Sequence, residues 1–306
     1  MATALGAAQR SLLERLLADG VEHLWVAYAD YNGRTQGKSI PRARFETTLL
    51  KGITFAQANL GHNVLDIGAP DTRFEADSGD FFAVPDPDSF AIYPLVPATG
   101  HAYCWMRQEG GDPWGGDPRW LLQQQVDALA ALGLSVQAAF EPEGYLFRIG
   151  EHGEPVPFEP RGMFTLDGLE TNAELLHRMS DTLEAAGVGI EQIATEFGPG
   201  QFEINIRHAN PIKAADDLLS VHDLARGVAR READPDRGEE PARVLAGDQG
   251  LADEAGQDAE DDRADHETCL RSLMTAVLMR ATLPGPQTRR PRERWSAARR
   301  QAVGAG

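Results

Sequence analysis

The segment from Glu196 to Ile206 constrains the fold of this chain most strongly, because it joins a turn signal to strict alternation. Gln201, Glu203 and Asn205 fall on one face of a strand, and apolar residues fall on the other. Pro199-Gly200 suits the two central positions of a tight turn. The pattern predicts a hairpin in which Glu196 lies directly opposite Glu203 on a polar face.

Like charges that face each other across strands are destabilising. Such a pair indicates a bound cation, a raised pKa or an exposed edge where solvent weakens the repulsion. A second segment, Phe140 to Phe147, also has the pattern of a strand, with Glu141 and Glu143 on one face. Pro142 cannot donate to a ladder, so we expect this segment at an edge or in irregular backbone. Carboxylates on strand faces can supply the oxygen ligands that Mg²⁺ and Mn²⁺ prefer.

These motifs together resemble the catalytic domain of the glutamine synthetase family. The resemblance extends from about residue 20 to about residue 231. Besides the glutamate motifs and the Gly198 to Glu203 run, it includes the following segments: Asn32-Gly33-Arg34 leading to Lys38, Gly79-Asp80 leading to Pro85-Asp86, Asp117-Pro118-Arg119, and Ala214-Ala215-Asp216. It implies an α+β fold with a small N-terminal β-grasp domain, then a curved antiparallel catalytic sheet with helices, incomplete at the C-terminus.

The resemblance also implies a chemistry. Family members phosphorylate the side-chain carboxylate of glutamate with ATP, and ammonia, or a larger amine in the amine-ligase relatives, displaces the phosphate. By resemblance, Glu143, Glu196 and Glu203 would hold one Mg²⁺ or Mn²⁺ ion, and Glu141 would share a second ion on the nucleotide phosphates. Glu191 matches a family glutamate near the nucleotide. A homo-oligomer is expected, in which the N-terminal domain leans over a neighbour's active site.

The composition of the chain limits the kinds of partner and the cellular compartment that we expect. The chain of 306 residues is long enough for two domains, and its net charge of -18 argues against nucleic acid or an anionic membrane surface as a partner. Cys104 and Cys269 stand far apart without metal-like spacing, which favours a reduced compartment. The sequence shows neither a signal-peptide pattern nor a membrane-spanning apolar run, so we expect a cytoplasmic protein.

The sequence patterns and the resemblance together predict four parts of the chain. These are an N-terminal helix in 1–20, the β-grasp domain in 21–112, part of the catalytic domain in 113–231, and an aberrant, largely disordered tail in 232–306. Helices are expected over 11–18, from 118 to about 132, over 172–186 and over 213–231. The second should bury an apolar stripe that comprises Leu121, Leu122, Val126, Leu129 and Leu132. Some polar residues are expected at the surface or only partly packed, namely the acids Asp66 and Asp71 and the histidines His101, His208 and His222.

The sequence departs from the family beyond Arg231. The expected Lys-Pro strand end and Gly-Ser-Gly-x-His motif are absent, no lysine follows Lys213, and only 268–283 has a helical pattern. One hypothesis is a reading-frame shift, since one choice of codons for Glu232 to Glu240, read one nucleotide later, encodes the family-like Arg-Leu-Ile-Pro-Thr-Val-Ala-Lys. The nucleotide sequence tests this. Two functions therefore stay open, an ATP-dependent ligase and an inactive fragment that keeps part of the metal and nucleotide site.

Overall fold

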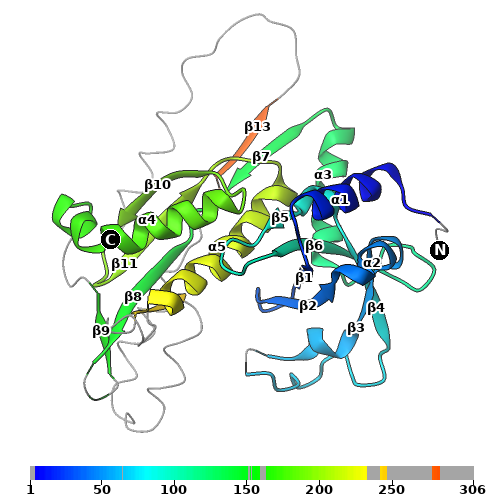
Figure 1. Ribbon diagram of the computed structural model, residues 1–306, viewed down its shortest axis with the longest axis horizontal. Coiled ribbons are helices and arrows are strands. Elements are labelled where there is room, and N and C mark those ends of the chain that lie inside the picture. Colours follow the sequence, from blue (N-terminus) through cyan, green and yellow to red (C-terminus); the bar gives the residue numbers. More distant parts are fainter. Residues whose placement is uncertain are drawn as a thin grey trace, which may run out of the picture.

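The computed structural model describes residues 4–63, 65–150, 152, 154–158, 163–232, 242–246 and 278–282. These residues form an α+β structure with two main sheets, one in each half of the chain (Figure 1). The long helix α5 (Pro211–Glu232) lies between the halves and contacts elements of both. None of the helices in the described part of the chain is long and apolar enough to cross a bilayer.

The N-terminal half is built on a six-stranded sheet with the order β2-β1-β6-β4-β3, with β5 paired to β6. The strands are β1 (His23–Ala29), β2 (Thr35–Pro41), β3 (Ile53–Ala56), β4 (Asp80–Pro85), β5 (Ala91–Ile92) and β6 (Thr99–Arg107). Only β1 and β6 among these pairs are parallel. The hairpin predicted at Asn32-Gly33 is confirmed, because β1 and β2 pair antiparallel around it and Gly33 takes a φ of 75°.

Two helices, α1 (Ala7–Ala18) and α2 (Phe45–Lys51), complete the first core. Leu12, Leu16, Phe45 and Leu49 are buried there with the apolar residues of the sheet. Three short 3-10 helices connect the strands, at Arg42–Arg44, Gln57–Gly61 and Pro87–Ser89. Helix α1 begins four residues earlier than the predicted range of 11–18.

The second half begins with α3 (Pro118–Ala131), for which the predicted cap is confirmed: the Asp117 carboxylate accepts a hydrogen bond from the Arg119 amide. The predicted burial of its apolar stripe is wrong, since no residue of α3 is buried. Leu121 is 49% exposed and Leu132, just after the helix, is 74% exposed. The helix makes few contacts, chiefly with α5, β7 and β6, so its outer face stays open in this chain.

The second sheet has the order β10-β11-β8-β12, with β9 paired to β8, and all of its pairs are antiparallel. Its strands are β8 (Glu143–Ile149), β9 (Pro155–Pro157), β10 (Ile190–Thr195), β11 (Gln201–Ile206) and β12 (Ala242–Ala246). A separate pair joins β7 (Ser135–Ala139) to β13 (Leu278–Thr282). Because β13 is a strand, the helix predicted over 268–283 is wrong for 278–282; the rest of that range lies outside the described residues.

Helices α4 (Leu166–Ala185) and α5 pack on one face of this sheet. Their apolar residues meet the buried side of β11 in a second core, which includes Phe202, Ile204, Ile206, Leu175, Met179, Leu183, Val221, Leu224 and Val228. Helix α4 starts six residues before the predicted Asn172, because Thr165 caps it by accepting a hydrogen bond from Gly168. This packing leaves the other face of β11, which carries Gln201, Glu203 and Asn205, for polar chemistry.

Candidate functional site

The Pro199-Gly200 turn forms as predicted. The Gln201 amide donates to the Gly198 carbonyl at 2.9 Å, and Gly200 takes a φ of 77°, as a type II turn requires. A β-carbon on Gly200 would stand 2.4 Å from the Leu146 carbonyl oxygen, so only glycine fits there without a shift.

The predicted register of this hairpin is wrong by two residues. Glu203 lies opposite Ala194, and the Glu196 amide donates to the Gln201 carbonyl at 2.9 Å. The reason is that Phe197 and Gly198 leave the ladder and enlarge the loop. A shift of two residues keeps each side chain on its face, so Glu196 and Glu203 still share the polar face, as diagonal neighbours.

The direct partner of Glu203 is Glu143, on the neighbouring strand β8. Glu141 precedes the regular part of β8, where Pro142 interrupts the strand as predicted. Pairing continues through this irregular backbone, since the Ile204 and Ile206 amides donate to the carbonyls of Pro142 and Phe140. The start of β8, the end of β10 and the strand β11 thus bring four carboxylates close enough for their charges to interact, namely those of Glu141, Glu143, Glu196 and Glu203.

The electrostatics of this carboxylate group favour protonation or a cation. Burial raises the pKa of Glu196, and the neighbouring Glu143 carboxylate adds to the increase. Burial also raises the pKa of Glu203, with further contributions from the charges of Glu141, Glu196 and Glu143. Glu196 is the most enclosed of the four, at 9% exposure. The unfavourable charge density would be relieved by a divalent cation.

Two amide side chains on the same face were not identified as site residues from the sequence. Gln201 donates to Glu143 from Nε2 to Oε2 and accepts from the Gly198 amide through Oε1. The Asn205 side chain hydrogen-bonds to Glu203, which offsets part of the increase that burial causes in the pKa of that carboxyl. Their alternation with Glu203 along β11 was the available signal. Both amides hold the carboxylates in place without a metal ion.

In the described part of the chain, no three acidic, histidine or cysteine side chains stand at the mutual distances that a metal ion requires. The donor chemistry nevertheless fits Mg²⁺ or Mn²⁺, since the group consists of carboxylates on one sheet face. Ligation therefore requires side-chain rotation, although Glu143 accepts from Gln201 through Oε2 only and keeps Oε1 available for an ion.

Glu191, the candidate nucleotide residue, stands apart from this group. It lies on β10 where the register shifts between Ile190 and Gln192, and its exposed carboxylate forms an ion pair with Arg207 at 3.1 Å. Its charge is not among those that shift the pKa of Glu196 or Glu203. The structure therefore brings together Glu141, Glu143, Glu196 and Glu203 but not Glu191.

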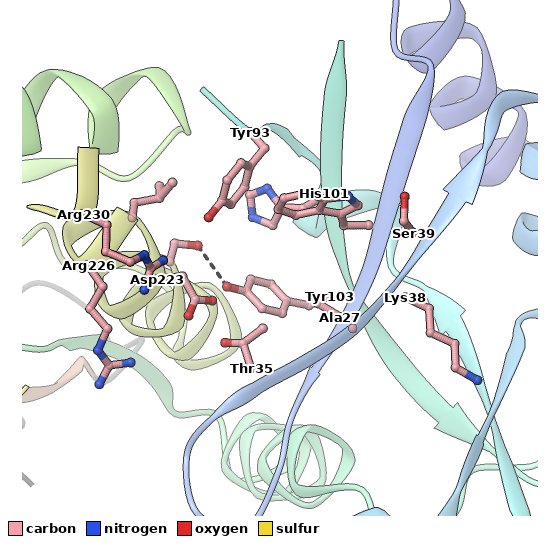
Figure 2. Close-up of a pocket in the computed structure, with 14 residues that line it drawn as sticks. Ala27, Thr35, Lys38, Ser39, Tyr93, His101, Tyr103, Asp223, Arg226 and Arg230 are labelled. Carbon is pink, nitrogen blue, oxygen red and sulfur yellow. Dashed lines mark hydrogen bonds between the residues drawn. The ribbon is translucent and has the colours of Figure 1, made fainter. Parts of the chain in front are cut away.

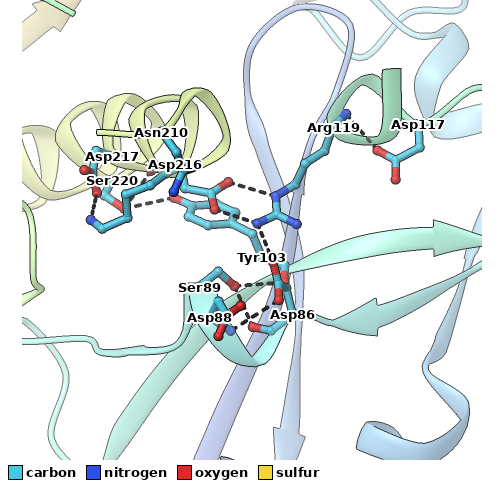
Figure 3. Close-up of polar contacts among 11 residues, drawn as sticks. Asp86, Asp88, Ser89, Tyr103, Asp117, Arg119, Asn210, Asp216, Asp217 and Ser220 are labelled. Atoms are coloured by element: carbon cyan, nitrogen blue, oxygen red, sulfur yellow. Dashed lines mark hydrogen bonds and ion pairs between the residues drawn. The ribbon is translucent and has the colours of Figure 1, made fainter. Parts of the chain in front are cut away.

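A second polar cluster joins the two halves of the molecule (Figure 3). The Arg119 guanidinium bridges Asp86, at 2.7 Å, and Asp216, at 2.8 and 3.0 Å, and it also lies over the Trp105 ring at 3.9 Å. These residues come from the loop after β4, from α3 and from α5. Three segments noted for their family resemblance thus meet in one mostly buried ion network that links α3 and α5 to the loop after β4.

Comparison with known proteins agrees with this geometry. Residues 115–234 match the family described as "Glutamine synthetase, catalytic domain". The chain is 28% identical over 234 residues to the glutamine synthetase of Thermus thermophilus and 26% identical over 229 residues to that of Halobacterium salinarum. These matches cover 74% and 73% of the chain, and 50% and 48% of the two relatives. The chain thus spans about half the length of the curated relatives it matches.

Solved structures give the same result. One is the crystal structure of a novel glutamine synthase homolog, whose sequence is 28% identical to this chain. The two structures align with a TM-score of 0.63 over 73% of this chain and 50% of the homolog's chain. A complex of GmaS with ADP has a TM-score of 0.65 over 78% of this chain and 51% of its own; at 21% identity, it supports the fold alone. The catalytic-domain match over residues 115–234, the carboxylate-bearing strands and the 28% identical relatives together support a protein of the glutamine synthetase family.

Proposed function

We propose that this chain has the chemistry of a glutamine synthetase-type ligase, which uses ATP to join ammonia or an amine to the side-chain carboxylate of glutamate through a γ-glutamyl phosphate. The observation that carries the proposal is the group of four glutamates on one face of the second sheet, with the pKa values of Glu196 and Glu203 raised by burial and mutual repulsion. Phosphoryl transfer between anions needs charge neutralisation and alignment of the reacting groups.

Each glutamate has a proposed role. Glu143, Glu196 and Glu203 would hold one Mg²⁺ or Mn²⁺ ion beside the acceptor carboxylate, and Glu141 would face the nucleotide phosphates. When bound, the ions supply electrostatic stabilisation of the transferring phosphoryl group. The turn at Gly200 fixes the separation of Glu196 and Glu203, and the hydrogen bonds from Gln201 and Asn205 orient the neighbouring carboxylates. Glu191 would contact the nucleotide only if its ion pair with Arg207 opens.

A second candidate function is a binding subunit without turnover. The catalytic-domain match ends at residue 234 although the chain continues to Gly306, and the sequence beyond Arg231 lacks the family's later motifs. Such a chain would bind a divalent ion and nucleotide without completing the ligase reaction. In either case we propose a homo-oligomer, with glutamate, ATP and ammonia or an amine as small-molecule partners.

The test combines binding and turnover on the full chain. Calorimetry would measure Mn²⁺ binding, and phosphate release would be followed with ATP, glutamate, Mg²⁺ and either ammonium or a polyamine. Turnover of about 1 per second or more supports the ligase. Ion binding without turnover supports the binding subunit. If Glu203→Gln binds Mn²⁺ as well as the unmodified chain does, the carboxylate group is not the metal site and both proposals fail. Glu174→Gln, on exposed α4 surface, is the matched control.

A further inference from the structure

A cavity of about 500 Å³ lies between the N-terminal sheet and α5 (Figure 2), and none of the four glutamates lines it. Strands β1, β2 and β6 supply one side of it, and Ser220, Asp223, Leu224, Arg226 and Arg230 of α5 supply the other. Its size is in the range of small-molecule sites in proteins. The proposed ligase chemistry makes no use of this cavity.

The α5 end of the cavity is polar and carries a net positive charge. The Asp223 carboxylate interacts with the charges of both Arg226 and Arg230. Figure 2 shows Arg230 and Asp223 beside the hydroxyl groups of Tyr93 and Tyr103. Lys38 does not add to this charge, because its ammonium group donates to the Thr54 carbonyl and lies over the Phe55 ring. Two guanidinium groups near one carboxylate give this end a net charge of about one positive unit, and Figure 2 shows that the Arg230 guanidinium is the one directed toward Asp223 and the tyrosines.

The wall on the β-sheet side is aromatic. Trp25 and Tyr93 stand with ring centroids 4.6 Å apart, and His101 contacts Tyr93 and Tyr103 edge-on at 5.7 and 5.6 Å. His101 was predicted to be at the surface or partly packed, but it is only 7% exposed. Its Nδ1 is buried without a hydrogen-bond partner in the described structure. Because that nitrogen is inaccessible from the cavity, His101 contributes the apolar part of its ring to the wall.

The cavity and the proposed reaction site use different residues, since the lining of the cavity includes none of the four glutamates. Val221 and Ala225 of α5 pack in the second core beneath the carboxylate-bearing strands. Ser220 and Asp223 point from the same helix into the cavity, and Ser220 forms a buried hydrogen bond of 3.1 Å with Tyr103 of β6. A ligand here would contact both halves of the molecule.

We propose that this cavity is a binding site for a small organic monoanion with a carboxylate and a planar apolar body. The carboxylate would pair with Arg230, with Arg226 nearby, and would accept from the Tyr93 hydroxyl. The apolar body would lie against Trp25 and His101. A monoanion balances the charge, since it offsets the excess guanidinium while Asp223 stays ionised.

The test uses three probes of one shape, titrated by calorimetry into the full chain: 3-phenylpropionate, its neutral amide 3-phenylpropanamide, and the cation 2-phenylethylamine. We expect saturable binding of the carboxylate, with a Kd at least about tenfold below that of either analogue. Equal binding of the carboxylate and the amide would overturn the proposal. So would the absence of saturable carboxylate binding up to about 10 mM. This comparison needs no variant, so it does not depend on a variant's folding.

Substitution then locates the site. Arg230→Gln should lower the affinity for 3-phenylpropionate by about tenfold or more. The affinity for 3-phenylpropanamide should stay unchanged, because the substitution removes only the charge pairing. Arg230 is exposed and at the last turn of α5, so the variant should fold, which circular dichroism checks. Arg178→Gln on α4 is the control. Unchanged carboxylate affinity in Arg230→Gln would place binding elsewhere and refute the site. Both outcomes are independent of ligase turnover.

Discussion

Glu143 and Glu203 lie directly opposite each other on adjacent antiparallel strands, and their carboxylates share one face of the sheet with Glu196. Such an arrangement costs stability unless a proton or a cation reduces the repulsion. These opposed carboxylates stand beside a well-packed apolar core. That contrast is the main physical argument that the polar face of the second sheet serves a chemical function.

Removing one of the opposed charges should stabilise the metal-free protein. Glu203→Gln is expected to raise the free energy of unfolding by about 0.5 kcal/mol in a chelator-containing buffer, since it relieves a cross-strand repulsion. Urea denaturation measures it. Mn²⁺ should raise the melting temperature of the unmodified chain and leave that of the variant nearly unchanged, because only a folded site binds the ion. A lower metal-free stability of Glu203→Gln would contradict the expectation.

The same repulsion predicts a pH dependence of stability. Glu196 and Glu203 have folded-state pKa values above the ordinary 4.5, so just above that value the folded state holds more protons than the unfolded state. Their contribution therefore makes the protein less stable as pH rises from 4.5 through the raised pKa values. We expect the stability advantage of a Glu196→Gln, Glu203→Gln double variant to be small below pH 4.5 and to grow as pH rises. An advantage that is larger in acid would refute this assignment.

The turn that sets the spacing of Glu196 and Glu203 should be intolerant of a side chain. Gly200→Ala combines a φ of 77° with a β-carbon 2.4 Å from the Leu146 carbonyl oxygen. The expected loss of unfolding free energy is more than about 1 kcal/mol. Gly115→Ala is the matched control, because no atom lies within 4 Å of its added β-carbon, and it should change stability by less than about 0.5 kcal/mol. Similar losses in the two variants would show that the turn is not specially constrained.

Local sequence chemistry predicted several elements well. The Asn32-Gly33 turn, the Asp117 cap with Pro118 behind it, and the two faces of β11 all follow from short-range rules and are present. The register of the β10–β11 hairpin was missed because nothing in the local pattern indicates that Phe197 and Gly198 leave the ladder. The assignment of side chains to the two faces of the hairpin was still correct, because the register differs by an even number of residues.

Predictions that depended on long-range packing failed more often. His101 has polar character, but β6 is an inner strand with α5 on one side, and that placement buries the ring. The apolar stripe of α3 has a proper helical period, yet its outer face has little to pack against. The Asp86–Arg119–Asp216 network joins residues 33 and 97 positions apart, a proximity that spacing in the sequence does not reveal. The carboxylate roles and the domain boundaries stay predictions.

The ion network between the halves should be essential for stability. Arg119→Met leaves two mostly buried carboxylates without their cation, so we expect a loss of about 3–5 kcal/mol in unfolding free energy. Arg178→Met is the control, because its ion pair with Glu174 is exposed and worth only about 0.3–0.5 kcal/mol. Adding Asp86→Asn and Asp216→Asn to Arg119→Met should recover part of the loss. No recovery would show that the guanidinium packing on Trp105, rather than charge pairing, dominates.

His101 should make the protein less stable in mild acid. Burial lowers its pKa to about 4 from the ordinary 6.5, so between these values the unfolded state binds a proton that the folded state does not. Stability from this residue is therefore complete above pH 6.5 and declines as pH falls toward 4, by roughly 2 kcal/mol at pH 5. His101→Phe should be less sensitive to this change, although His222, whose pKa burial also lowers, retains a smaller dependence in the same direction. Nuclear magnetic resonance of the ring protons gives the direct measurement: a midpoint near 6.5 would refute both the burial and the neutral imidazole in the cavity wall.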